Sequence, residues 1–202
     1  MIFEKGFLYH IYNQGNNRQK IFYNRKNYLF FLKKLNEYIL PFSEVLAWCL
    51  MPNHFHLMVL IKEVESQGFT LSETLTNATS NPSSTKRTFN NSIGILLRTY
   101  TRAINKQEGA TGSLFRKETK AECINCFKSA KPNFILNNIS INNHLSEKQY
   151  PQICFNYIHQ NPVRANLTNI ATDWEFSSAR DYKGLRNCTL INKEISKVYV
   201  EF

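Results

Sequence analysis

The sequence His54-Phe55-His56 is the feature whose residue types and spacing are best suited to chemistry. In a β-strand, residues two apart point to the same face, so both imidazoles project side by side while Phe55 turns toward the core on the opposite face. Two histidines at this spacing are able to share one metal ion. The alternative is a pair of half-exposed histidines on a sheet face, which is the more frequent outcome for an isolated pattern this short.

A metal site built on this pair needs a third ligand from elsewhere in the chain. Residues 57–61 are Leu, Met, Val, Leu and Ile, so the further carboxylate or histidine ligands of a binuclear hydrolase do not follow the pair. A hydrolase built on a β/α barrel needs roughly 250 residues of alternating strand and helix, which is not the pattern here. An oxygen donor as third ligand suits Mg²⁺ or Mn²⁺ better than a structural Zn²⁺.

We expect that third donor in the segment 156–164. Tyr157 and Asn161 are four residues apart, so on a short helix that ends near Pro162 they lie on one face. Asn161 is then placed to reach the metal, and Tyr157 to point at a phosphate bound there. Most tyrosines pack against apolar neighbours with the hydroxyl hydrogen-bonded, and we expect this role for most of the ten tyrosines in the chain. Tyr157 differs from them because polar residues surround it in the sequence.

Hydrophobic spacing predicts the elements that position these residues. In chain order they are a strand at 7–13, a helix at 28–39, a hairpin of strands at 45–50 and 55–61, a helix at 93–104 and a charged edge strand at 113–120. This βαββαβ order predicts an α+β, ferredoxin-like fold, an antiparallel sheet with two helices on one face. A further helix at about 152–160 carries Tyr157.

Charge distribution favours a nucleic-acid partner. The 202 residues include 25 Lys and Arg against 15 Asp and Glu, a net charge of +10. Residues 1–40 and 98–131 each carry +5, while residues 41–97 carry −1. Arg98, Arg102 and Lys106 recur every four residues on the second helix, so they form a basic ridge. Clustered charge of this kind is expected of a protein that binds a phosphate backbone, although solvated helix faces would also produce it.

Composition excludes several other classes. With 43% hydrophobic residues the chain can bury a core, so a wholly disordered basic tail is ruled out. No apolar run approaches the roughly 20 residues that span a bilayer, and the first residues lack the pattern of a signal peptide. The five scattered cysteines predict a reducing compartment rather than a disulfide framework. The single C-x-x-C pair, Cys123 and Cys126, would need two more ligands to hold a structural zinc ion. We therefore expect a cytoplasmic protein.

Six segments in order carry a resemblance to a known family. They are YHIYNQGNNRQKIF at 9–22, AWCLMPNHFHLMV at 47–59, RTYTRAINKQ at 98–107, GSLFRKETK at 112–120, YIHQNPVRANL at 157–167 and DWEFSSARDY at 173–182. Together they span nearly the whole chain, and the sequence resembles the single-tyrosine HUH transposases, most closely the REP-associated tyrosine transposases. The resemblance implies one HUH catalytic domain at 1–167, with a Ser/Thr/Asn-rich insertion at 63–91, and a C-terminal extension at 168–202 packed on or tethered to it.

The resemblance also implies roles for the residues. His54 and His56 become metal ligands, with Asn161 as third ligand and Gln160 as its fallback, and Tyr157 becomes the nucleophile. The implied activity is Mg²⁺- or Mn²⁺-dependent cleavage and rejoining of single-stranded DNA at hairpins, through a 5′-phosphotyrosine link. The resemblance also implies that the protein lies in the cytoplasm, associated with the nucleoid. It leaves open whether the protein is a monomer or a homodimer. The residues expected to hold the DNA backbone are Arg98, Arg102, Lys106, Arg116, Lys117, Lys120 and Arg164.

Two alternatives remain open. Tyr12 with Asn16 is a rival nucleophile spacing, disfavoured because Tyr12 is expected to be a core strand residue that leads into a glycine turn. A hairpin DNA- or RNA-binding protein that has lost catalysis is the alternative function, although no Gly-aromatic signature of RNA-binding modules is present. His10 and His159 are expected to be structural or DNA-facing, and His144 a loop residue. The segments 63–91 and 121–150 depart from the family pattern.

Overall fold

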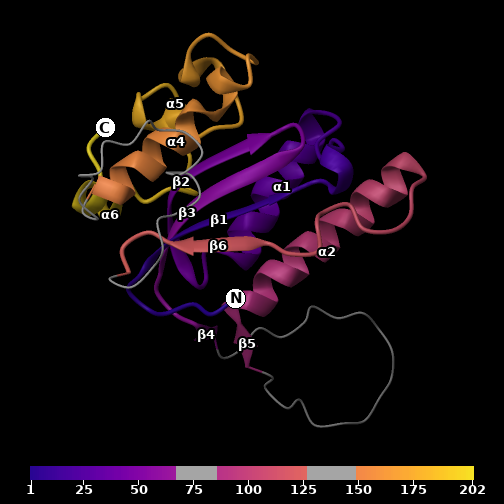
Figure 1. Ribbon diagram of the computed structural model, residues 1–202, viewed down its shortest axis with the longest axis horizontal. Helices are drawn as coiled ribbons and strands as arrows, with labels where there is room; N and C mark the ends of the chain where they lie inside the picture. The colour runs from indigo at the N-terminus through magenta and orange to yellow at the C-terminus, as the bar shows by residue number, and fades with distance from the viewer. Residues whose placement is uncertain (67–85, 127–148) are drawn as a thin grey trace.

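The computed structural model describes residues 1–66, 86–126 and 149–202. Within them, four strands form one sheet in the order β2-β3-β1-β6, and every neighbouring pair is antiparallel (Figure 1). These strands are β1 (Leu8–Gln14), β2 (Ser43–Met51), β3 (His54–Ile61) and β6 (Lys120–Cys123). The predicted four-stranded antiparallel sheet of an α+β protein is therefore confirmed.

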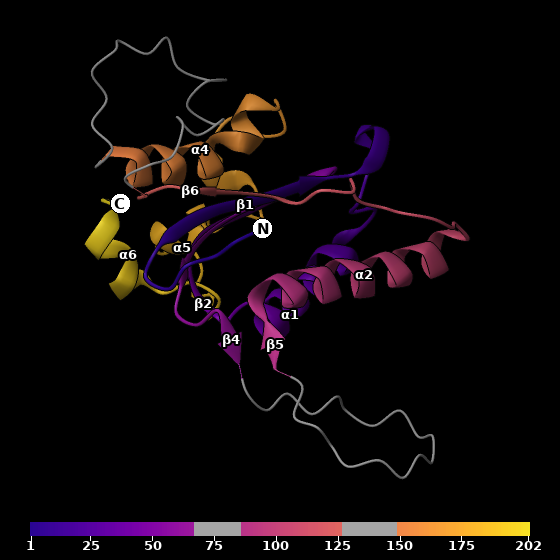
Figure 2. The same ribbon diagram turned by 60° about the horizontal axis from the view of Figure 1, so that its bottom comes forward.

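Two long helices cover one face of this sheet, α1 (Arg25–Tyr38) and α2 (Phe89–Glu108) (Figure 2). The side chains of Asn24 and Thr88 cap them by accepting hydrogen bonds from backbone N–H groups of the first turn. Helix α2 ends at Gly109, whose φ of 61° is a left-handed conformation that glycine adopts without a steric penalty. With these caps, both helices begin before the apolar stripes that predicted them.

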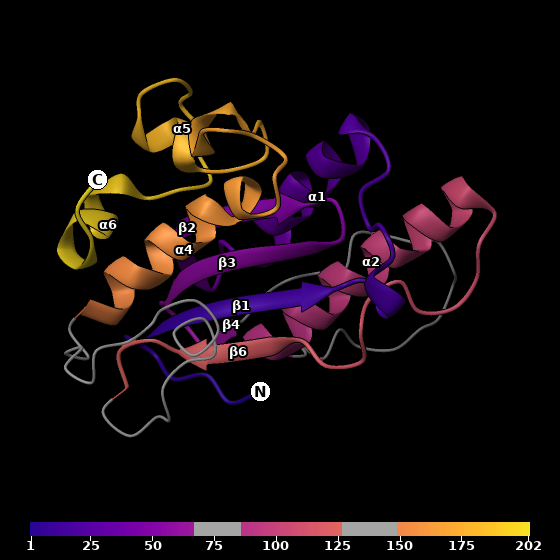
Figure 3. The same cartoon turned by 45° about the horizontal axis from the view of Figure 1, so that its top comes forward.

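Helix α4 (Tyr150–Arg164) lies on the opposite face, so the sheet is held between two helical layers (Figure 2). It packs on β2 and β3, which Figure 3 shows running beside it. The helix is longer than predicted, because it continues past Pro162. Although this proline lacks an N–H, the last turn is held by Ala165, whose N–H donates to the Asn161 carbonyl at 3.0 Å.

Alternation along the strands divides the apolar residues between the two faces. Ile11, Phe55 and Leu57 pack against α1 and α2, and the ring centroid of Phe55 lies 5.2 Å from that of Phe31 on α1. On the other face, Leu8, Cys49 and Met58 pack with Cys154, Phe155 and Ile158 of α4. The histidine pair faces this second layer, as the alternation predicts.

The segment 113–120 is not the regular edge strand that was predicted. Leu114 and Phe115 are adjacent and both buried, whereas an edge strand with charged residues is expected to leave one of its faces exposed to solvent. The side-chain amide of Asn13 donates to the carbonyl of Arg116 at 3.2 Å and to Thr119 Oγ1 at 2.9 Å, where a strand would use backbone groups. Regular pairing begins at Lys120, opposite Tyr12, where the predicted strand ends.

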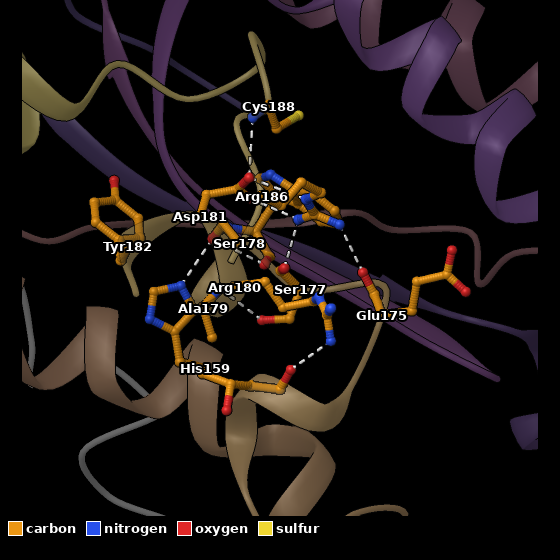
Figure 4. Close-up of polar contacts among 12 residues, drawn as sticks. His159, Glu175, Ser177, Ser178, Ala179, Arg180, Asp181, Tyr182, Arg186 and Cys188 are labelled. Atoms are coloured by element: carbon orange, nitrogen blue, oxygen red, sulfur yellow. Dashed lines mark hydrogen bonds and ion pairs between the residues drawn. The ribbon is translucent and has the colours of Figure 1, made fainter. Parts of the chain in front are cut away.

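The C-terminal residues pack along the outer edge of β2. The backbone N–H of Leu50 donates to the Phe176 carbonyl, and the N–H of Ser178 donates to the Trp48 carbonyl, both at 2.9 Å. The buried carboxylate of Asp181 accepts hydrogen bonds from Arg186 and from a backbone N–H (Figure 4). The elements of this part are η3 (Ala171–Asp173), α5 (Ala179–Tyr182) and α6 (Lys193–Tyr199). The proposed division at residue 167 stays a prediction.

Three short elements complete the described chain: η1 (Asn16–Arg18), β4 (Glu65–Ser66) and β5 (Arg87–Thr88). Strands β4 and β5 pair with each other, so the ends of the predicted insertion lie together. His144, expected to be a loop residue, lies outside the described residues.

The C-x-x-C pair differs from expectation. Cys123 and Cys126 are joined by a disulfide, because the chain turns after β6 and brings their Cα atoms to 5.7 Å, within the usual span of such a bond. Cys49 and Cys154 are free and buried, and Cys188 is free and half-buried. No helix in the described part of the chain is long and apolar enough to cross a membrane.

Candidate active site

Strand β3 presents His54 and His56 on the face of the sheet that α4 covers. Their ring centroids lie 5.0 Å apart in an edge-to-face arrangement. His56 is 5% exposed, whereas His54 is half-buried at the end of the strand. The pair is therefore held rigidly, with access to solvent on the side of His54.

Each of these imidazoles is held through Nδ1 by a polar neighbour. His54 Nδ1 lies 2.6 Å from Asn53 Oδ1, and His56 Nδ1 lies 2.9 Å from Nε2 of His10. Histidines that bind metals in proteins are usually held in this way, through the nitrogen that does not touch the metal. In both residues Nε2 is therefore the nitrogen suited to a ligand.

Helix α4 brings Tyr157 and Asn161 to the pair. The amide nitrogen of Asn161 donates to the Tyr157 carbonyl at 2.8 Å, and the Asn161 side chain lies beside His54. Because the nitrogen is directed at that carbonyl, the amide oxygen is the atom left to face the histidine. The ring centroid of Tyr157 lies 5.4 Å from that of His56. The predicted residues thus meet at one place, whereas the fallback Gln160 is exposed to solvent.

Burial controls protonation at this site. It lowers the pKa of His54 to about 4 and the pKa of His56 well below its usual value, where the charges of His10 and His54 add to the effect. Both imidazoles are therefore neutral at pH 7, the form that binds a metal ion. Burial raises the pKa of Tyr157, and the positive charge of Arg164, whose guanidinium carbon lies 5.2 Å from the ring centroid, offsets part of that rise.

Strand β1 and strand β6 add residues to this face that the sequence had not assigned to the site. His10 is 2% exposed and stacks on Tyr12 with ring centroids 4.7 Å apart. Tyr12 lies opposite His56 in the ladder, and its hydroxyl donates to Glu122 at 2.7 Å. The expectation that Tyr12 lies in the core is wrong, because alternation places it on the site face. Residues His10 and Tyr12 repeat the i, i+2 spacing of the histidine pair, a signal that would have found them.

The site opens into a cavity of about 220 Å³. Tyr157 and the two histidines form one part of its wall, and Tyr12 forms another. Charged side chains from the segment before β6 complete it: Arg116, Glu118 and Lys120. Lys120 pairs with Glu118 at 2.8 Å, so its charge is partly compensated.

A second, basic hollow of about 490 Å³ lies between α2 and the segment 112–119. Arg98 and Arg102 line it from α2, and Arg116 and Lys117 line it from the facing segment. All four side chains are exposed, and none of the described residues that line the hollow is acidic. Arg116 also lines the active-site cavity, so the two hollows adjoin. We refer to this second hollow as the basic groove. Lys106, also predicted to hold DNA, is exposed on α2 outside it.

The donor set at the histidine pair is unusual for a structural metal. In residues 1–66, 86–126 and 149–202, no group of three or more His, Cys, Asp or Glu side chains is arranged to hold a metal ion. The groups that converge are instead two neutral imidazoles and one amide oxygen. Such a set leaves coordination positions for other oxygen ligands.

The fold and the site together define an α+β protein in which an H-x-H pair on a central strand faces a tyrosine on a helix. A solved structure of a REP-associated tyrosine transposase bound to a REP hairpin is similar to this chain, with a TM-score of 0.52, 14% sequence identity, and coverage of 95% of this chain and 94% of that chain. No family model and no curated protein sequence matches the chain. The resemblance predicted from the motifs is thus confirmed at the level of the fold.

Proposed function

We propose that the protein is a transposase-like endonuclease and strand transferase that cleaves single-stranded DNA at or near hairpins. The observation that carries the proposal is the meeting of His54, His56 and Tyr157 in one cavity, from a strand and a helix far apart in the chain. The similar structure, a tyrosine transposase bound to a hairpin, supports the same activity. In this proposal the βαββαβ part is a ferredoxin-like HUH domain and α4 is its tyrosine helix.

The residues present fit a divalent cation. His54 and His56 would hold it through Nε2 and Asn161 through its amide oxygen, a mixed N and O set compatible with Mg²⁺ or Mn²⁺. When bound there, the ion stabilises the negative charge that develops on a nonbridging phosphate oxygen. The Nδ1 contacts of both histidines fix the rings before the ion arrives, so little ordering remains to be done on binding.

Tyr157 would act as the nucleophile. Its hydroxyl oxygen forms a bond to phosphorus as the bond from phosphorus to the 3′ oxygen breaks, and the proton lost by the phenol is balanced by one gained by the leaving 3′-OH. Arg164 favours the phenolate because its positive charge lies near the ring. The product is a 5′-phosphotyrosine, and a second 3′-OH reverses the step to join strands without ATP.

The DNA would run from the cavity into the basic groove. Arg116 belongs to both hollows, so a strand whose phosphate lies at Tyr157 meets Arg116 next and then the α2 arginines. The groove has four cations and no acidic residue in its described lining. This charge suits a DNA backbone, which carries about one negative charge per phosphate. We assign a DNA partner on this basis and its hairpin form from the similar solved complex, and we place the protein in the cytoplasm with that DNA.

Covalent trapping tests the proposal. Labelled single-stranded DNA hairpins from the region that flanks the gene are incubated with the protein and Mn²⁺, then resolved under denaturing conditions. The expected result is a metal-dependent covalent band that is absent for Tyr157→Phe, although that variant still binds the hairpin. Adduct formation that survives in both His54→Ala and His56→Ala would contradict the metal site.

A protein that binds hairpins without cleaving them is the second candidate. The specific observation in its favour is that, in the described part of the chain, no group of three or more His, Cys, Asp or Glu side chains is arranged to hold a metal ion. This candidate predicts tight hairpin binding with no covalent band at any Mn²⁺ or Mg²⁺ concentration. The same trapping experiment therefore separates the two functions.

A further inference from the structure

His10 lies behind the histidine pair and contacts the inner member. Its Nε2 is 2.9 Å from Nδ1 of His56, and the two rings stack with centroids 5.1 Å apart at 16°. Strand β1 pairs with β3 so that Tyr12 stands opposite His56, which makes His10 the diagonal neighbour of His56 on the same face. Both residues are almost fully buried, at 2% and 5% exposed, so water does not compete for this contact.

We propose that His10 is a positioning residue that holds His56 in the tautomer and ring orientation needed to bind a divalent cation. The inference rests on the proposed metal site and adds a residue to it. His10 itself touches neither the cation nor the DNA in this arrangement. Its role is exerted through the hydrogen bond to His56.

The direction of that hydrogen bond follows from the chemistry of imidazole. A neutral ring carries one proton, and the nitrogen that binds a metal must offer a lone pair. If Nε2 of His56 is the metal-binding nitrogen, its proton resides on Nδ1 and Nδ1–H donates to Nε2 of His10. His10 is then the acceptor, with its own proton on Nδ1. The opposite direction would leave a proton on the nitrogen of His56 that faces the cavity, and that tautomer does not bind a cation.

The surroundings fix His10 in turn. Its ring stacks on Tyr12 with centroids 4.7 Å apart at 26°, and the hydroxyl of Tyr12 is held by Glu122. The same principle operates at the outer histidine, where Asn53 Oδ1 receives Nδ1–H of His54 at 2.6 Å. Each histidine of the pair thus has an acceptor at Nδ1, one from the turn before β3 and one from the neighbouring strand.

Mn²⁺ affinity without DNA is the measurement that tests this role, because it does not depend on turnover. Free Mn²⁺ is quantified by electron paramagnetic resonance in titrations of the wild type and of His10→Phe, which keeps a ring of similar size but offers no acceptor. We expect a loss of Mn²⁺ affinity of about 10- to 100-fold, the usual effect of removing such a partner. His10→Gln, whose amide oxygen can accept, is expected to restore most of the affinity.

His159→Phe is the matched control. His159 is also a buried histidine, but its Nε2 is 2.8 Å from Oγ of Ser178, in the C-terminal part that packs on β2 (Figure 4). This substitution removes a buried imidazole without touching the pair, so Mn²⁺ affinity should be unchanged. Unchanged affinity in His10→Phe as well would overturn the positioning role. Unchanged affinity in both His54→Ala and His56→Ala would instead show that the proposed metal site is wrong.

A second measurement needs no variant and guards against misfolding of His10→Phe. Long-range ¹H–¹⁵N correlation spectra of the wild-type protein report which ring nitrogen of each histidine carries the proton. The expected result is a proton on Nδ1 of His56 and on Nδ1 of His10. A proton on Nε2 of His56 would overturn the proposal.

Discussion

Two tyrosine hydroxyls reach the same cavity, and their charged neighbours distinguish them. Tyr12 donates to the carboxylate of Glu122, so removing its proton would place two negative charges in contact. Tyr157 lies beside Arg164, whose charge favours a phenolate and offsets part of the rise in the pKa of Tyr157 that burial and Glu122 cause. Arg164 is therefore the feature that favours Tyr157 as the nucleophile, and Tyr12 is placed to support His10.

Arg164 offers a test of this distinction. We expect Arg164→Gln to slow covalent adduct formation about tenfold at pH 7, because a nearby charge contributes on the order of 1–2 kcal/mol at a partly exposed site. Since the substitution removes a cause that lowers the pKa of Tyr157, the rate should recover as the pH is raised. Single-turnover rates from pH 6 to 10 measure both effects. Lys183→Gln, which removes an exposed charge from the C-terminal part, is the control. If the pH profile of the single-turnover rate is the same in Arg164→Gln as in the wild type, Arg164 does not activate Tyr157.

At the scale of elements, the site depends on a strand and a helix that approach from different layers. Strand alternation alone places His54 and His56 on one face, and helical spacing alone aligns Tyr157 with Asn161, so these features could be predicted from the sequence. The contact of His10 with His56 depends on the register of β1 against β3, which no local pattern specifies. The position of β6 was also missed, since the burial of both Leu114 and Phe115 is a tertiary effect.

The basic groove between α2 and the segment 112–119 gives a prediction at this scale. Replacing Arg98 and Arg102 by Ala should weaken hairpin binding and reduce the slope of log K against log salt by about 0.7 for each lost phosphate contact on a single strand. Fluorescence anisotropy at several salt concentrations measures the slope. Adduct formation at saturating DNA should persist, because neither arginine lines the active-site cavity. The control is the Lys33→Ala and Lys183→Ala double variant, whose slope should equal that of the wild type. If the Arg98 and Arg102 double variant also has the wild-type slope, the DNA binds elsewhere on the protein.

The C-terminal elements depend on a buried ion pair. Asp181 is fully buried and receives Arg186 Nε at 3.0 Å and the N–H of Cys188 at 3.0 Å. Asp181→Ala leaves the guanidinium without its partner, so we expect the free energy of unfolding to fall by about 3 kcal/mol. Urea denaturation followed by tryptophan fluorescence measures the loss. Glu194→Ala, which breaks an exposed pair with Lys197, should have little effect; equal stabilities for the two variants would argue against the buried pair.

At the scale of the whole molecule, buried histidines link stability to pH. Burial lowers the pKa of His10 and of His159 to about 3, whereas an unfolded histidine titrates near 6.5. Below about pH 6.5 the unfolded chain therefore binds protons that the folded chain does not. The free energy of unfolding should be largest above that pH and fall as the pH drops toward 3, by up to about 1.4 kcal/mol per pH unit for each histidine.

Urea unfolding at pH 7.5, 6.5, 5.5 and 4.5 measures this dependence. His159→Phe removes one of the titrating groups, so its stability should fall less steeply with decreasing pH than that of the wild type. Identical slopes for the two proteins would show that His159 is not held neutral in the folded state.

The most direct test of the account is the identity of the residue that carries the DNA. After reaction with a hairpin substrate and Mn²⁺, the adduct is digested with nuclease and trypsin and analysed by tandem mass spectrometry. Trypsin cleavage at Lys148 and Arg164 yields residues 149–164, which hold Tyr150 and Tyr157, and cleavage at Lys5 and Arg18 yields residues 6–18, which hold Tyr9 and Tyr12. If Tyr157 is the nucleophile, the nucleotide is found on Tyr157 alone. A nucleotide on Tyr12, or an adduct on any other residue, would contradict this assignment.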